Sequence, residues 1–141
     1  MSSTTTTVDP ARPLTAAGVI TLGVALVLLE LPVLVDLAAL WRSVPYYSHG
    51  LLIPLFSAWL VWDTRHTLRL GPGGKVLGSG VIVLGIGVLA LGFVLESLTV
   101  RALSVPVLAL GLAIVGFGPR RLGPVAFPIG FLVLMAPLPG D

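Results

Sequence analysis

Five long runs without a charged residue limit most strongly how this chain can fold. They hold 17, 20, 20, 18 and 19 residues and are bounded by Arg12 and Glu30, Arg42 and Asp63, Lys75 and Glu96, Arg101 and Arg120, and Arg121 and Asp141. An α-helix needs about 20 apolar residues to cross the hydrocarbon core of a bilayer, with a range of about 17–25. The sequence therefore predicts a helical protein that crosses the membrane about five times.

The scarcity of charge agrees with lipid as the main solvent. Charged residues make up 10% of the 141 residues, and the mean hydropathy is +1.07. A soluble domain usually carries roughly a quarter of its residues as charges. The net charge of +2 does not indicate nucleic-acid binding, because the basic residues stand between the apolar runs instead of forming one patch. The expected partner of the chain is the lipid bilayer.

The predicted fold class is all-α, a polytopic transmembrane helix bundle. Residues 1–13 are polar, Thr-rich and interrupted by proline, so we expect a disordered tail before a membrane domain at 14–141. The first apolar run is longer than a usual signal-peptide core, and no small-x-small cleavage site directly follows it, so we expect a retained helix. The predicted spans are 14–31, 48–62, 76–95, 102–117 and 123–137.

Two of these spans leave alternatives open. Glu30, Pro32 and Asp36 either end the first helix or carry it into an interfacial segment that reaches Trp41. The fifth span contains several prolines, so a re-entrant segment is the alternative to a full crossing there.

The distribution of basic residues predicts the orientation. With a cytoplasmic N-terminus, six of the eight fall on the inner side: Arg12, Arg65, Arg69, Lys75, Arg120 and Arg121. The outer side then holds Arg42 and Arg101. Lys and Arg accumulate in short cytoplasmic loops, so this orientation is favoured. Aromatic residues that prefer the two membrane interfaces stand at the same boundaries, Trp41, Tyr46 and Tyr47 outside and Trp59 and Trp62 inside.

Glycines recur at seven-residue spacing in the third span. One series is Gly78, Gly85 and Gly92, and the second is Gly80 and Gly87. Small residues let helix backbones approach closely in lipid. The pattern fits a dimerisation face, but packing inside the bundle is the favoured interpretation.

His49 is the residue most suggestive of chemistry. It follows Tyr46, Tyr47 and Ser48 at the outer end of the second span, and an ionisable group at membrane depth indicates a functional site. An interfacial histidine satisfied by water is the equally weighted alternative. His66 is expected to be a solvated loop residue, whereas Glu96 and Arg101 bracket a short outer turn and could pair.

The chain has no cysteine, and its two histidines do not have the spacing of a zinc site. It also lacks a phosphate-binding loop, a dinucleotide fingerprint and a nucleophile elbow. We therefore expect no cofactor, no metal and no complete catalytic set within these residues.

The stretch YYSHGLLIPLFSAWLVW, with the basic loop after it, resembles the N-terminal half of exosortases, in the exosortase/archaeosortase family. The later FPIGFLVLMAPLPGD is similar to that family's mid-chain span. The resemblance covers about residues 14–141. It carries Tyr47, Ser48, His49 and Gly50 over as the family's outer-face Ser-His-Gly element, with a supporting or substrate-binding role.

This resemblance implies a membrane-embedded cysteine peptidase or transpeptidase in a cell membrane, more typical of bacteria than archaea. Its partner would be the C-terminal sorting-signal helix of exported proteins, of the PEP-CTERM type. The family's catalytic cysteine and arginines are expected beyond Asp141, so the implied partners include a missing C-terminal half or a second copy. The alternative is a non-enzymatic membrane scaffold or half-transporter subunit.

Overall fold

The structure is a computed structural model that describes residues 16–67 and 74–137, and every regular element in these ranges is helical. The α-helices are α1 (Ala16–Ser43), α2 (Leu52–Asp63), α3 (Lys75–Val94), α4 (Leu98–Phe117) and α5 (Gly123–Leu132). The 3-10 helices are η1 (Pro45–Leu51), η2 (Arg65–Thr67), η3 (Pro119–Arg121) and η4 (Val133–Met135). The predicted all-α bundle is confirmed, while the predicted tail at 1–13 lies outside the described residues.

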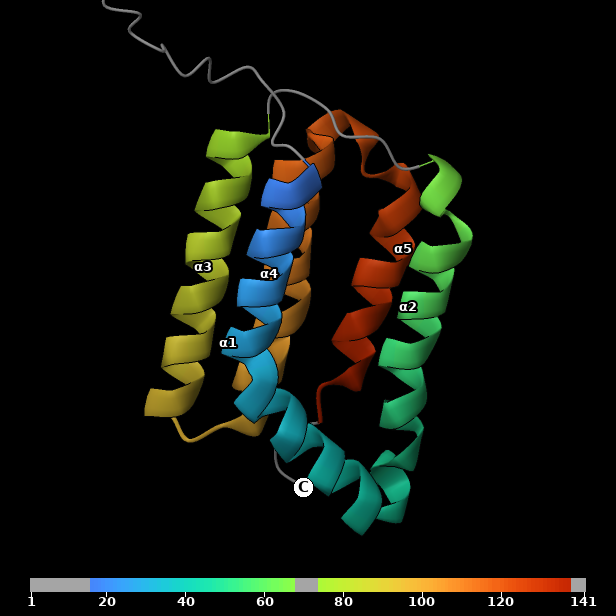
Figure 1. Cartoon of the computed structure of the whole chain (residues 1–141). Coiled ribbons are helices and arrows are strands. Elements are labelled where there is room, and N and C mark those ends of the chain that lie inside the picture. The colour runs from blue at the N-terminus through green and yellow to red at the C-terminus, as the bar shows by residue number, and fades with distance from the viewer. Residues whose placement is uncertain (1–15, 68–73, 138–141) are drawn as a thin grey trace, which may run out of the picture.

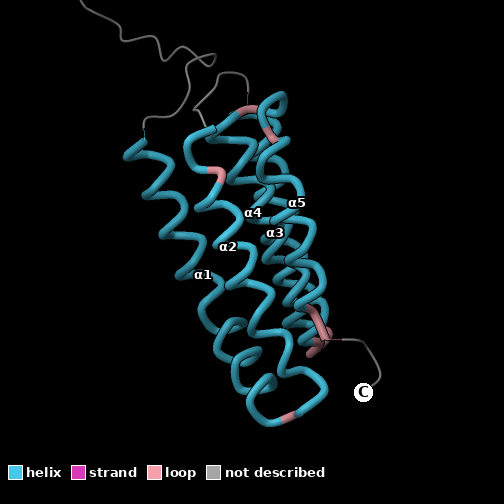
Figure 2. Tube along the Cα trace, turned by 90° about the vertical axis from the view of Figure 1, so that its right-hand side faces the viewer, coloured by secondary structure: helices cyan, strands magenta, loops and turns pink. Residues whose placement is uncertain are grey.

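The helices alternate in direction, so their connections gather at two ends of the bundle (Figures 1 and 2). One end, here called the basic end, carries Arg65, Lys75, Arg120 and Arg121, at or just beyond the ends of α2, α3 and α4. The opposite end contains η1 and is called the His49 end. Arg42 and Arg101 belong to that end. The basic residues of alternate connections thus lie at the same end of the bundle, as the predicted orientation requires. Which end faces the cytoplasm stays a prediction.

Within the part of the chain that the structure describes, three helices, α1, α3 and α4, are long and apolar enough to cross a membrane. The shorter α2 and α5 are each extended by a 3-10 helix, so that 45–63 and 123–135 are almost continuously helical. The α5 segment starts directly after Arg121 and ends against the first turn of α4, where Thr99 Oγ1 donates to the Pro137 carbonyl at 2.7 Å. It therefore runs between the two ends of the bundle; whether it crosses the membrane fully or is re-entrant stays a prediction.

The first helix does not end near residue 31 but continues through Pro32 to Ser43. A proline inside a helix removes one backbone hydrogen bond and introduces a bend. Figure 1 shows the C-terminal half of α1 turning away from the line of its first half. The turn brings the end of α1 against η1, where it forms one wall of the site described below.

Two polar contacts join this bent helix to α4. Ser104 Oγ lies 2.7 Å from Glu30 Oε1, and both residues are buried. Arg101 Nη1 lies 3.0 Å from Asp36 Oδ2 in a partly exposed ion pair. The acidic residues can therefore stay on a continuous α1 because α4 supplies their partners. Arg101 forms its ion pair across helices, and not with Glu96 in its own turn as the sequence suggested.

Replacing Ser104 with alanine should weaken the α1–α4 contact. Glu30 Oε2 has no partner in the described structure, so the hydroxyl of Ser104, at Oε1, is the hydrogen-bond partner of this buried carboxyl group. Hydrogen bonds between transmembrane helices contribute about 0.6–1.7 kcal/mol, so we expect a loss of about 1 kcal/mol. SDS titration of the purified protein in mixed micelles measures it. Glu30→Gln should lose less, because its amide still accepts from Ser104; an equal loss in both variants would contradict this account.

The first glycine series lies in the α3–α4 contact. A Cβ atom at Gly78, Gly85 or Gly92 would overlap atoms of α4, whereas one at Gly80 or Gly87 would meet nothing within 4 Å. Packing inside the bundle is therefore the role of the first series. The second series lies on an open face of α3.

Candidate functional site

The Ser-His-Gly element forms η1, which links α1 to α2 at the His49 end. Pro45 begins this 3-10 helix, and the extended backbone of Val44 before it is the conformation that a following proline favours. Ser48 Oγ donates to the Pro45 carbonyl at 2.8 Å, and the Leu52 N–H donates to the His49 carbonyl. The turn is thus held by local hydrogen bonds and passes directly into α2.

A cavity of about 990 Å³ opens beside this turn. Its walls come from the end of α1 (Leu40 and Trp41), from η1, and from η4 with Ala136. Three of the four predicted residues, Tyr47, His49 and Gly50, line it. Ser48 does not, because its hydroxyl turns back to its own helix. Three of the four predicted residues therefore lie around one cavity. Ser48 instead stabilises the turn through its hydrogen bond to Pro45.

Gly50 is required there by the close approach of Trp41. A Cβ atom at position 50 would lie 2.6 Å and 2.7 Å from Trp41 Cδ1 and Cε2, so the indole ring or the turn would have to shift. Trp41 itself is 6% exposed and belongs to the hydrophobic core at this end, with Val33, Leu37 and Met135 among its members. Trp41 stands near the end of α1 beside η1, and its ring packs inward onto this turn; its place at the membrane interface stays a prediction.

His49 stands between two hollows. Its exposed side chain also lines a second cavity of about 820 Å³, which extends along α2 and α5 past Leu52, Phe56 and Phe131. The surroundings are apolar except for the tyrosines of η1. A neutral imidazole has one hydrogen-bond donor and one acceptor. The arrangement can therefore hydrogen bond an extended peptide while apolar walls receive its side chains.

Sequence reasoning missed the α5 side of this site. Leu134 lines both cavities and Met135 is 2% exposed in the core, although neither carries a polar signal. The similarity of FPIGFLVLMAPLPGD to a family segment marked the region but could not place it beside η1. Within residues 16–67 and 74–137 no three potential metal-binding side chains come together.

The apolar bundle with a polar-rimmed hollow at one end defines the class, a multi-pass helical membrane protein. Comparison with protein families then gives the particular family. The model of the transmembrane exosortase family (Exosortase_EpsH) matches residues 41–141, and this chain belongs to that family. The match begins at Trp41. It includes all the residues that line the His49 cavity except Leu40. No curated protein and no solved structure matches the chain.

Proposed function

We propose that this chain is the membrane framework of an exosortase-like peptidase or transpeptidase in a bacterial cell membrane. It processes C-terminal sorting signals of the PEP-CTERM type on exported proteins. The observation that carries the proposal is the His49 cavity, in which the family's Ser-His-Gly element meets η4 at one end of the bundle.

Such a reaction needs a cavity at the membrane surface. A substrate held by its own transmembrane helix presents the cleavage site where that helix leaves the lipid. The His49 end offers apolar walls for the flanking side chains and an imidazole for the peptide backbone. In the predicted orientation this end faces outward, toward the exported part of the substrate.

The nucleophile of the proposed reaction comes from outside these residues, because none of the 141 is a cysteine. A thiolate is activated by a neighbouring cation or base. Arg101 lies at the His49 end but forms an ion pair with Asp36 and packs against α1 and α3, so it supports the framework. His49 is assigned a supporting role in substrate binding and no place in the catalytic set.

His49→Ala tests this role in cells that carry the complete gene product and a reporter protein ending in a sorting signal. One hydrogen bond to substrate contributes about 0.5–1.5 kcal/mol, so processing should fall by about two- to twelvefold. Immunoblots separate processed from unprocessed reporter. The matched control is His66→Ala, which removes the exposed histidine of η2 at the basic end and should leave processing intact. Unchanged processing in the His49 variant at normal protein levels would refute its role.

A further inference from the structure

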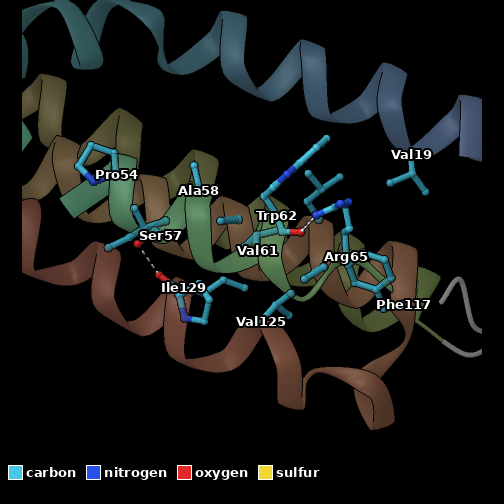
Figure 3. Close-up of a pocket in the computed structure, with 15 residues that line it drawn as sticks. Val19, Pro54, Ser57, Ala58, Val61, Trp62, Arg65, Phe117, Val125 and Ile129 are labelled. Atoms are coloured by element: carbon cyan, nitrogen blue, oxygen red, sulfur yellow. Dashed lines mark hydrogen bonds between the residues drawn. The ribbon is translucent and has the colours of Figure 1, made fainter. Parts of the chain in front are cut away.

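A third cavity, an almost wholly apolar groove, opens at the other half of the bundle, toward the basic end. Its volume is about 560 Å³, within the range of about 300–1,000 Å³ typical of ligand pockets. Figure 3 shows side chains of α2, α4 and α5 around it, with Val19 of α1 on one side. The proposed sorting reaction at the His49 end does not use this groove.

The side-chain hydroxyl in the body of the groove is already paired. Ser57 Oγ donates to the Pro128 carbonyl at 3.0 Å, and the contact is buried. The charged side chain of the lining is Arg65, beyond the end of α2. Among the described lining residues none is acidic, and the exposed Asp63 is not part of the lining. The groove therefore combines an apolar body with a cation at one end.

Arg65 is held at this end by Trp62. Its Nη1 donates to the Trp62 carbonyl at 2.6 Å, and its guanidinium carbon lies 4.2 Å from the centre of the Trp62 ring. A guanidinium group carries five N–H donors in a planar fork that suits phosphate oxygens. The side chain is exposed, so the remaining donors can reach a group at the membrane surface.

The length of the groove distinguishes two possible ligands, a transmembrane helix and the acyl chain of a lipid. Its wall on α2 and the following η2 runs from Pro54 to Arg65. At about 1.5 Å per residue this is about 16 Å, close to half of a hydrocarbon core of about 30 Å. On α4 the wall covers only Ala109 to Phe117, the half of that helix next to the basic end. A transmembrane helix would need the whole thickness, whereas an acyl chain of one leaflet needs half.

We infer that this groove binds one anionic phospholipid of the leaflet at the basic end. An acyl chain lies between α2, α4 and α5, and the headgroup phosphate contacts Arg65. Three further basic residues, Lys75, Arg120 and Arg121, stand at the same end of the bundle and add to the attraction for an anionic headgroup. In the predicted orientation this is the cytoplasmic leaflet.

Native mass spectrometry of the purified full chain with added lipid tests the inference. Phosphatidylglycerol and phosphatidylcholine with identical acyl chains are compared as probes, together with inorganic phosphate. The wild-type chain should retain one phosphatidylglycerol in preference to phosphatidylcholine, and inorganic phosphate should not displace it. Arg65→Gln should weaken phosphatidylglycerol binding about fivefold, the effect expected for one basic contact near a membrane surface.

A second variant tests the binding of the acyl chain. Ala58 is exposed on the groove wall, so Ala58→Phe should obstruct the chain of either lipid without disturbing a buried contact. Two controls match these changes: Arg120→Gln removes a basic-end charge outside the lining, and Ala90→Phe enlarges an exposed position on α3. Ala90→Phe should bind phosphatidylglycerol like the wild type, and Arg120→Gln should weaken its binding clearly less than Arg65→Gln does. Equal retention of the two lipids, displacement by inorganic phosphate, or equal losses in variant and control would overturn the inference.

Discussion

Gly78→Ala is expected to separate α3 from α4 and to lower the free energy of unfolding by about 1–3 kcal/mol, the usual cost of overpacking. The added Cβ would lie 2.7 Å from the Val115 amide nitrogen and 2.9 Å from the Gly111 carbonyl oxygen. Both atoms belong to the backbone of α4, so no side-chain rotation relieves the clash. The helix axes themselves must move apart.

The chain contains a matched control for this change. Gly80 lies on the same helix, and a Cβ there meets nothing within 4 Å. Gly80→Ala should therefore leave stability unchanged or raise it slightly, because alanine favours a helix more than glycine does. Unfolding of each variant in mixed SDS micelles, followed by circular dichroism, compares the two. Equal stabilities for the two alanine variants would rule out a tight α3–α4 contact at Gly78.

The second large effect is expected from Gly50→Ala at the His49 cavity. The new methyl group would overlap the Trp41 indole, which is buried in the core and has little room to retreat. Either the ring or η1 must shift, and both line the cavity. We expect a loss of about 1–3 kcal/mol in stability and, since η1 carries His49, a fall in reporter processing of at least tenfold.

A compensating substitution distinguishes this steric cause from a general loss of folding. Trp41→Leu removes the atoms that the new methyl group would meet, so the double variant should recover more processing than Gly50→Ala alone. Gly130→Ala serves as the matched control, because a Cβ at that position on α5 meets nothing within 4 Å. If Trp41→Leu brought no recovery in the Gly50→Ala background, the overlap would not be the cause of the defect.

The sequence predicted the membrane bundle well because its signals are local. A helix in lipid satisfies its own backbone, so the length of an uncharged run alone indicates a crossing. The third run predicted 76–95, and α3 spans Lys75–Val94. The first run left open whether its helix ends at Glu30 or continues to Trp41, because the partners that keep Glu30 and Asp36 on α1 come from α4, more than sixty residues later.

The residues of the candidate site could be predicted from the sequence, but their contacts could not. Tyr47, Ser48, His49 and Gly50 could be selected from the sequence because they are polar or small residues beside an apolar run and resemble a family element. The contact of Gly50 with Trp41, and of η1 with η4, depends on how α1 bends at its C-terminal half. No spacing in the sequence encodes that direction.

By itself, then, the sequence determined that the chain lies in lipid, where its helices run, and which end of the second span carries His49. Composition and run length suffice for this because each apolar segment partitions into the bilayer independently. Only the tertiary structure decided which glycines contact α4, that Trp41 faces inward, and that two hollows open at opposite halves of the bundle. The physical reason is that packing between helices in lipid depends on close fit between distant segments, and hydropathy is the same on every apolar face.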